Sequence, residues 1–339
     1  MEKWYSIRGS ENDVVQSTRI RLVRNLDEFP FTSRLTLSEA QKLNETVKNI
    51  ILADNRYSLS YIDMAALTET QAVSLAERFL VSPEFASDTS GRALLLSEDE
   101  KISIMLCEED HVTIQVASSG LDLENTFSVA GNIDDMLDAG AGYAFDKRIG
   151  YLTQSPANLG TGMRASLVMH LPALSATGEI PRLSSTVSKL GLALKCFFSD
   201  RTTPVGCIYQ LSNRVTLGIS EDAALKNLRS IAAQIITRER QARETVTADD
   251  KYIDKIYRAY GLLCSAYMMT CREFTELASF VRLGGACGII DADIMKIDEL
   301  MTDVQPATMN ASQGRNLTSL QRDKIRAAEI KKALCPSES

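Results

Sequence analysis

The sequence has no long apolar run. No window of its 339 residues approaches the roughly eighteen consecutive apolar positions of a membrane-spanning helix. The first 15 residues, MEKWYSIRGSENDVV, also lack the apolar core of a secretory signal. We therefore expect a soluble cytoplasmic protein without membrane contact.

Cysteine motifs are also missing. The seven cysteines are odd in number and scattered, and no Cys-x-x-Cys spacing occurs. This distribution excludes the common spacing of a structural zinc site and argues against a disulfide framework. We expect reduced and mostly buried thiols.

An excess of positive charge is absent as well. The formal net charge is −7, with 37 Lys and Arg residues against 44 Asp and Glu residues. This balance gives no general attraction to nucleic acid or to an anionic membrane. An anionic ligand must then be met by a local arginine cluster, so the placement of the arginines is informative.

The spacing of apolar residues predicts strands and helices along the whole chain. Strands are expected over residues 17–26, 92–99, 101–107 and 111–118, and a hairpin over 205–218 with its turn at Ser212 and Asn213. Helices are expected over 36–49, 69–80, 123–137, 184–195 and 221–245. From residue 253 onward the chain is helical, with breaks at 282–288 and 309–316. The polar segment at 246–250 predicts a boundary between domains 1–246 and 247–339.

Arg19 and Arg21 alternate with apolar residues in the segment STRIRLVRNL, residues 17–26. In an extended segment this alternation places both guanidinium groups on one face of the strand. Each group offers a rigid fork of donors to phosphate oxygens. The pair could bind a polyphosphate chain, and alternating surface arginines are the simpler alternative.

A second candidate site is the segment SPANLGTGMRAS, residues 155–166. Gly160 and Gly162 allow sharp turns or close approach to a ligand, and free amide groups in such a loop can point at an anion. Arg164 adds a cation. The segment matches neither the GxxxxGK[ST] nor the GxGxxG nucleotide loop. An ordinary glycine turn beside a solvated arginine is the alternative.

A third candidate is the segment EEDH, residues 108–111, which places three carboxylates beside one of only two histidines. Such a group could orient a cationic substrate or accept a proton, and a solvated acidic turn is the alternative. The other histidine, His170, lies in an apolar run. We expect it to be a hydrogen-bonded strand residue and not a ligand.

Together these motifs resemble the ATP:guanidino phosphotransferase family, which includes creatine kinases, arginine kinases and bacterial protein-arginine kinases. The segments STRIRLVRNL, EEDH, NLGTGMRAS followed by LPAL, and QLSNRVTLG occur in the family's order, and the resemblance covers nearly the whole chain. The segment RDKIRA, residues 322–327, is similar to the RDxxRA element of the protein-arginine kinase branch. The likeness is closest to that branch.

The resemblance implies an α+β fold with a mainly antiparallel sheet flanked by helices, followed by a C-terminal helical domain. It implies transfer of the γ-phosphoryl group of ATP to arginine side chains of proteins, with Mg²⁺ held mainly by the nucleotide phosphates and no metal site on the protein itself. Glu109 would orient the acceptor guanidinium and could take its proton, with Glu108 beside it. The implied phosphoarginine-binding residues are Arg322, Asp323 and Arg326. The implied ATP-binding residues are Ser17, Thr18, Arg19, Ile20, Arg21, Arg164, Ala165, Ser166, Leu167, Val168, Lys195, Cys196, Phe197, Phe198, Ser199 and Asp200.

The chain departs from the family pattern at several positions. Phe79 replaces a nucleotide-contacting histidine, Thr113 replaces a phosphate-binding arginine, and Lys195 replaces another arginine. Further replacements are Cys107 for asparagine, Ser155 for cysteine, Cys196 for glycine and Asp200 for glutamate. A clamp that loses an arginine loses both charge and forked geometry, and one lost transition-state donor can cost ~10²–10³ in rate.

The sequence thus leaves three functions open. The first is an active protein-arginine kinase, and the second is a weakened kinase fold that binds nucleotide or phosphoarginine proteins. The third is a kinase for a free guanidino compound, which the lack of the usual preceding helical domain disfavours. The expected partners are proteins with exposed arginine, an activator protein and a second copy of the chain, with no nucleic acid.

Overall fold

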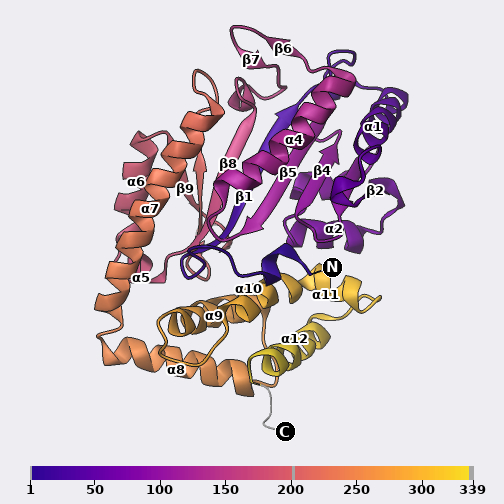
Figure 1. Cartoon of the computed structure of the whole chain (residues 1–339). Helices are drawn as coiled ribbons and strands as arrows, with labels where there is room; N and C mark the ends of the chain where they lie inside the picture. Colours follow the sequence, from indigo (N-terminus) through magenta and orange to yellow (C-terminus); the bar gives the residue numbers. More distant parts are fainter. Residues whose placement is uncertain (1, 201–202, 336–339) are drawn as a thin grey trace.

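An eight-stranded antiparallel sheet forms the centre of the fold (Figure 1). The computed structural model describes residues 2–200 and 203–335, and only the backbone of residues 199, 200, 203 and 204. The strand order is β2-β3-β4-β5-β1-β8-β12-β9. The strands are β1 (Val15–Arg24), β2 (Leu59–Asp63), β3 (Ala93–Ser97), β4 (Ile102–Leu106), β5 (Val112–Ser119), β8 (Met163–His170), β9 (Leu192–Cys196) and β12 (Ile208–Asn213). Two small antiparallel pairs are β6 (Phe145–Asp146) with β7 (Gly150–Tyr151), and β10 (Ser199–Asp200) with β11 (Thr203–Pro204).

Helices flank this sheet and follow it in the chain, which confirms the expected α+β class. Helices α4 and α7 lie across one face of the sheet, and the C-terminal helices lie at one end of it (Figure 1). The first group is α1 (Leu37–Leu52), α2 (Glu69–Glu77), α3 (Pro83–Ser87), α4 (Leu123–Ala141), α5 (Pro172–Ala176), α6 (Ile180–Lys189) and α7 (Glu221–Val246). The C-terminal group is α8 (Asp250–Ser265), α9 (Cys271–Ala286), α10 (Ile294–Asp303), α11 (Pro306–Ser312) and α12 (Ser319–Leu334). Short 3-10 turns include η1 (Trp4–Ser6). Within residues 2–200 and 203–335, no helix has both the length and the hydropathy needed to cross a bilayer.

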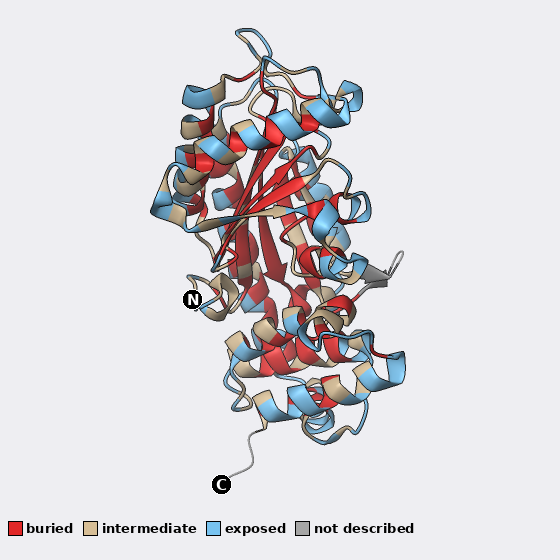
Figure 2. Cartoon of the chain, turned by 90° about the vertical axis from the view of Figure 1, so that its right-hand side faces the viewer, coloured by how far each residue is buried: buried red, intermediate tan, exposed pale blue. Residues whose placement is uncertain are grey.

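Strand β1 divides its side chains between a core and an open face. Ile20 and Leu22 are almost completely buried in the main core beneath α4 and α7, and Figure 2 shows the buried strands at the centre of the molecule. Arg19 and Arg21 therefore project from the opposite face, because side chains alternate along a strand. The core residues thus fix the side on which the arginines lie.

Most of the predicted elements are confirmed with small shifts of their ends, and three predictions are wrong. Residues 192–195 belong to β9 and not to a helix, because Gly191 at φ +77° ends the preceding helical segment. The expected turn at Ser212 and Asn213 is the end of β12, where the Asn213 side chain accepts a hydrogen bond from the backbone N–H of Ala165. Helix α9 continues through Gly284 and Gly285 and ends at Ala286. A Cβ on Gly285 would lie 2.4 Å from the carbonyl oxygen of Ala292, so this glycine permits close packing.

The buried guanidinium of Arg282 in α9 joins the C-terminal helices to the sheet. Arg282 is 0% exposed and donates to the carbonyl oxygens of Asn12 and Asp13, at 2.7 and 2.9 Å. It also donates to both carboxylate oxygens of Asp298 in α10, at 2.7 and 2.9 Å. The N-terminal segment, α9 and α10 are therefore held by one side chain.

His170 at the end of β8 is a hydrogen-bonded strand residue, as expected. Its Nε2 lies 2.8 Å from the Ser279 hydroxyl of α9, and its Nδ1 lies 3.3 Å from Nη1 of Arg282. Burial, and then the positive charges of Arg282 and Arg243, lower the pKa of His170. A neutral imidazole is the form that fits beside these cations.

The C-terminal helices also share a core with the sheet. Val168 of β8 and Ile208 of β12 lie in one buried cluster with Phe274 and Val281 of α9. The chain passes from α7 to α8 between Val246 and Asp250. The division into domains 1–246 and 247–339 stays a prediction.

The cysteines differ from the sequence expectation at two points, because two of them form a disulfide and Cys107 is the one free thiol that is fully buried. Cys264 of α8 and Cys335 after α12 form a disulfide with a Cα–Cα distance of 5.7 Å. No local spacing signals this pair, because the two residues are 71 positions apart. The other five cysteines are free thiols: Cys107, Cys196, Cys207, Cys271 and Cys287.

We expect Arg282→Ala to lower the free energy of unfolding by about 3–5 kcal/mol, because it leaves Asp298 and two carbonyl groups buried without their donor. Urea unfolding followed by circular dichroism measures this loss. The control is Arg229→Ala, which breaks an ion pair between two exposed side chains, Arg229 and Glu124, and should cost less than about 1 kcal/mol. Equal losses in the two variants would contradict the role of Arg282 as a buried junction.

Candidate active site

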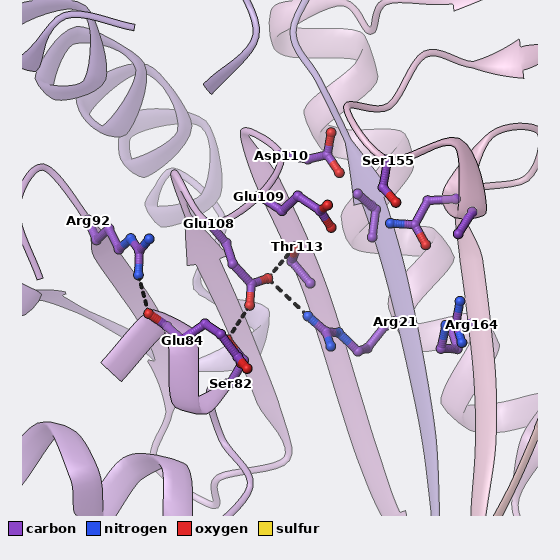
Figure 3. A pocket seen from close by; sticks show the side chains of 13 residues that line it. Arg21, Ser82, Glu84, Arg92, Glu108, Glu109, Asp110, Thr113, Ser155 and Arg164 are labelled. Atoms are coloured by element: carbon purple, nitrogen blue, oxygen red, sulfur yellow. Dashed lines mark hydrogen bonds and ion pairs between the residues drawn. The ribbon is translucent and has the colours of Figure 1, made fainter. Parts of the chain in front are cut away.

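A pocket of about 570 Å³ opens on the arginine face of the sheet (Figure 3). Strands β1, β5 and β8, the β4–β5 turn, α3 and the segment before β8 supply its walls. Its charged lining residues are Arg21, Arg92 and Arg164, together with Glu84, Glu108, Glu109 and Asp110. The structure thus brings together residues of all three candidate motifs.

Arg21 and Arg164 face each other across neighbouring strands. They are direct partners in the antiparallel register of β1 and β8. Burial, and then the charge of Arg21, lower the pKa of Arg164. Nε of Arg21 is buried without a hydrogen-bond partner, and no carboxylate pairs with Arg164 in the part of the chain described. Like charges opposite each other destabilise a sheet, so this pair is suited to an anion placed between the two groups.

Glu108 supplies the negative charge that holds Arg21. Its carboxylate accepts a hydrogen bond from Nη2 of Arg21 at 2.9 Å and from the Thr113 hydroxyl at 3.1 Å. It also accepts from the hydroxyl of Ser82, the N-cap of α3. Thr113 therefore occupies the family's arginine position with a neutral hydroxyl that is bonded to Glu108. The main contribution of Glu108 is to orient Arg21.

Glu109 is the carboxylate of the turn that is left open to a ligand. It lines the pocket and is exposed, and it lies beside Glu108 and Asp110 in Figure 3. Partial burial, and then the charges of Asp110 and Glu108, raise the pKa of Glu109. A cation would relieve this repulsion, so Glu109 is suited to bind a guanidinium group.

Asp110 and His111 fix the turn that carries these carboxylates. One oxygen of Asp110 accepts from the Asn25 amide and the backbone N–H of Gln154, at 2.7 and 2.6 Å. His111 is completely buried, with Nδ1 accepting from the N–H of Leu26 and Nε2 at 2.8 Å from the carbonyl oxygen of Pro30. Both ring nitrogens of His111 therefore bind the backbone, and its imidazole does not line the pocket.

The glycines of the 155–166 segment serve packing. A Cβ on Gly162 would lie 2.6 Å from Nη1 of Arg24, and one on Gly160, at φ +100°, would lie 2.2 Å from the carbonyl oxygen of Thr216. The N–H of Thr161 donates to that same carbonyl group. The lining residues from this segment are Ser155, Ala157, Asn158 and Arg164. Neither glycine lines the pocket, and the expectation that their amides face an anion stays a prediction.

Arg19 lies outside this pocket, in a second cavity of about 60 Å³. Its guanidinium carbon is 5.5 Å from the centre of the Phe79 ring, which in turn lies 4.6 Å from the ring of Phe197. Burial, and then the charge of Arg21, lower the pKa of Arg19 to about 10. Phe198 and α10 residues also line this cavity, so Arg19 and Arg21, although neighbours on one face of β1, line different cavities.

The other predicted ATP-binding residues have varied positions. Lys195 is exposed and lines neither cavity. Ser17 and Val168 line the second cavity, and the remaining strand residues Thr18, Ile20, Ala165, Ser166 and Leu167 are buried. Cys196 is half-buried at the end of β9, and the side chains of Ser199 and Asp200 lie outside the described residues. The ATP-binding assignment stays a prediction.

The predicted phosphoarginine residues lie on α12. Arg326 is buried and donates to the carbonyl oxygens of Val304 and Met269, and to the Asp323 carboxylate at 2.7 Å. Arg322 donates to the carbonyl oxygen of Leu317 at 2.6 Å. These contacts fasten α12 to its neighbours, and phosphoarginine binding stays a prediction.

Sequence reasoning did not propose Ser82 and Arg92 as site residues. Ser82 precedes Pro83, and this Ser-Pro pair is a recognisable helix start. Arg92 directly precedes β3 and its guanidinium donates to the carbonyl oxygen of Glu84 at 2.6 Å. Nothing in the sequence around Arg92 marks it as a pocket residue.

Two family models match the chain over most of its length. Residues 41–242 match the model "ATP:guanido phosphotransferase, C-terminal catalytic domain". Residues 249–339 match "Protein-arginine kinase McsB C-terminal domain". This chain belongs to the ATP:guanido phosphotransferase family.

Curated relatives support the same membership. A protein-arginine kinase of Caldanaerobacter subterraneus subsp. tengcongensis is 38% identical over 97% of this chain and 99% of its own length. Another, from Symbiobacterium thermophilum, is 39% identical over 98% of this chain and 96% of its own length. Both relatives therefore share the whole arrangement of this chain, including the C-terminal helices.

Solved structures agree on the fold. A lombricine kinase matches with a TM-score of 0.60 and 24% identity over 70% of this chain and 69% of its own. A duplicated taurocyamine kinase from Schistosoma mansoni matches with a TM-score of 0.64 and 20% identity over 80% of this chain and 40% of its own. At these identities the likeness concerns the guanidino kinase fold alone.

We expect Arg164→Gln to leave the free protein as stable as before or up to about 1 kcal/mol more stable, because it removes a like charge opposite Arg21. The same change should abolish most of the thermal stabilisation given by tripolyphosphate. Thermal unfolding with and without tripolyphosphate measures both effects. Arg148→Gln, at a residue whose side chain is 90% exposed, is the control and should keep the anion effect. A destabilised Arg164→Gln protein that still responds to the anion would contradict the arrangement.

Proposed function

We propose that this chain is a protein-arginine kinase that transfers the γ-phosphoryl group of ATP to arginine side chains of proteins. The observation that carries this proposal is the pairing of Arg21 with Arg164 in a pocket that also contains the free carboxylate of Glu109. The two arginines can bind the phosphates of ATP, and the Glu109 carboxylate can bind the guanidinium group of the acceptor arginine. The curated relatives named protein-arginine kinase support the same substrate class.

The residues present fit phosphoryl transfer by alignment. Arg21 and Arg164 would hold the phosphate oxygens, while Glu108 keeps Arg21 in place. A nitrogen of the acceptor guanidinium attacks the γ-phosphorus, the bond from that phosphorus to the bridging oxygen breaks, and ADP leaves. Since a free guanidinium has a pKa above ~12, its proton must leave as the bond forms. Glu109 would orient the guanidinium and receive that proton.

Mg²⁺ belongs to the nucleotide in this proposal. Among the described residues, no group of three or more His, Cys, Asp and Glu side chains could hold a metal ion. Phosphate oxygens would therefore provide most of its ligands. When bound, Mg²⁺ would neutralise part of the phosphate charge and polarise the γ-phosphoryl group.

A second candidate function is a kinase fold that binds ligands but transfers phosphate weakly. Thr113 is neutral and bonded to Glu108, and Arg19 lies behind Phe79 in a separate cavity. At two positions where the family pattern has a cation, those of Thr113 and Arg19, this chain therefore places no cation in the active-site pocket. A free guanidino compound as acceptor is a third candidate, and the match to the C-terminal protein-arginine kinase domain favours proteins.

The proposal extends to the setting of the reaction. The substrates would be cytoplasmic proteins with exposed arginine, and an activator protein and a homodimer would regulate the enzyme. The C-terminal domain would bind phosphoarginine through Arg322, Asp323 and Arg326. In the free protein, Nε and Nη1 of Arg326 already donate to Val304, Met269 and Asp323.

Transfer of ³²P from labelled ATP to an arginine-rich protein in the presence of Mg²⁺ tests the proposal. We expect an acid-labile product, since the P–N bond hydrolyses in acid, and a ~10²–10³-fold lower rate for Glu109→Gln. Glu69→Gln, at an exposed residue of α2 outside the pocket, is the control and should keep full activity. Nucleotide binding without any transfer would favour the second candidate.

We expect kcat/KM to fall at acid pH because the Glu109 carboxylate becomes protonated. Because the pKa of Glu109 is raised, its carboxylate is protonated at a higher pH than an ordinary glutamate, and activity is lost as the pH falls through that value. A pH profile of kcat/KM measures this limb. The residual activity of Glu109→Gln should lack it, and an unchanged limb in that variant would assign the titration to another group.

A further inference from the structure

Two further cavities adjoin the active-site pocket on its Glu108 side. The first, of about 300 Å³, shares Glu108 and Arg92 with the pocket. The second, of about 510 Å³, shares Arg92, Gly91 and Leu37 with the first. Neighbouring cavities therefore meet at shared lining residues, in a row that begins at the pocket of Arg21 and Arg164, passes Arg92 and ends at the edge strand β2. We name the two outer cavities the side groove.

The walls of the side groove come from α1, the edge strand β2 and the segment before β3. Its carboxylates are Glu45, Asp63 and Asp88 in addition to Glu108, and all three of the added groups are exposed. Leu37, at 56% exposure, gives the groove an apolar rim. The groove is therefore open, acidic and in part apolar.

Cations compensate only part of this charge. Arg92 lies 3.5 Å from Asp88, and Lys48 lies 3.1 Å from Glu45. Asp63 accepts a hydrogen bond from the backbone N–H of Ala65, and no cation pairs with it within the described stretches of the chain. The side groove therefore carries an excess of negative charge at its outer end.

The pocket and the side groove differ in charge and therefore suit different ligands. The nucleotide phosphates would lie beside Arg21 and Arg164, and the carboxylates of the side groove would repel them. An acceptor arginine beside Glu109 is the side chain of a longer polymer, so the polymer must leave the pocket along some surface. The side groove adjoins the pocket at Glu108 and Arg92, and its carboxylates have the opposite charge to a basic segment.

We propose that the side groove binds the polypeptide that flanks the acceptor arginine and favours lysine and arginine at the flanking positions. This inference rests on the proposed function and specifies its substrate. It assigns Asp63 and Glu45 to substrate selection, at positions outside the pocket where the phosphoryl group is transferred.

Charge reversal in the groove tests the proposal. Two twelve-residue peptides with one central arginine are compared, one flanked by lysines and the other by glutamates, with N-acetyl-arginine amide as a small acceptor. We expect the wild-type protein to prefer the lysine peptide through a lower KM. The double variant Glu45→Lys, Asp63→Lys should prefer the glutamate peptide instead, and the ratio of the two KM values should change by about tenfold. Each exposed ion pair contributes about 0.2–1 kcal/mol to such a preference.

The small acceptor and a matched variant supply the controls. N-acetyl-arginine amide cannot reach the side groove, so its kcat/KM should stay within about twofold in the double variant. Glu244→Lys changes an exposed charge on α7, which packs against β8 and β12 and not against the groove strands, and should leave the peptide preference intact. An unchanged preference in the double variant, or an equal loss for all three acceptors, would overturn the proposal.

Binding separates this inference from the proposed function. Fluorescence anisotropy of the two labelled peptides without nucleotide reports the groove even if no phosphate is transferred. A preference for the lysine peptide that the double variant reverses would support peptide binding in the side groove. The kinase activity itself would then be tested only by the labelled-ATP assay. Equal affinities of the wild-type protein for both peptides would refute the groove even in an active kinase.

Discussion

The opposition of Arg21 and Arg164 across β1 and β8 is the constraint on which the site depends. Burial of Ile20 and Leu22 in the core fixes which face of β1 carries the arginines, and a shift of one residue would turn them inward. The free protein contains two adjacent cations, and among the described residues Glu108 is the one carboxylate that pairs with them. The fold therefore holds a repulsion that a phosphate chain would relieve, which explains why it favours an anionic ligand although the chain as a whole is acidic.

The carboxylates around this pair differ in role because they differ in contacts. Glu108 is engaged with Arg21, Thr113 and Ser82, so it orients the phosphate side of the pocket. Asp110 is fixed by Asn25 and Gln154 and shapes the turn. Glu109 alone of the three is exposed, and partial burial, then the charges of its neighbours, raise its pKa. One short acidic turn thus supplies a support for the cations, a structural group and a free carboxylate for the acceptor.

Alternation and helical spacing predicted most of the elements, because they determine which side chains face the core, and the resemblance to the family implied the fold class and a site built from the three motifs. The sequence did not predict the roles of single residues within those motifs. The backbone contacts of His111 and the packing of Gly162 against Arg24 depend on segments distant in the chain. The contact of Arg19 with the ring of Phe79 and the Cys264–Cys335 disulfide likewise join residues far apart in the chain. The substitutions at Phe79 and Thr113 could be read from the sequence, but the hydrogen bond of Thr113 to Glu108 could not.

A crystal structure of the protein with ADP, Mg²⁺ and an arginine-containing peptide tests the central claim most directly. The account predicts that the terminal phosphate of ADP lies within hydrogen-bond distance of both Arg21 and Arg164, and that the peptide guanidinium contacts Glu109. A diphosphate bound beside Arg19 alone, with Arg21 still paired to Glu108 and no ligand between Arg21 and Arg164, would contradict it.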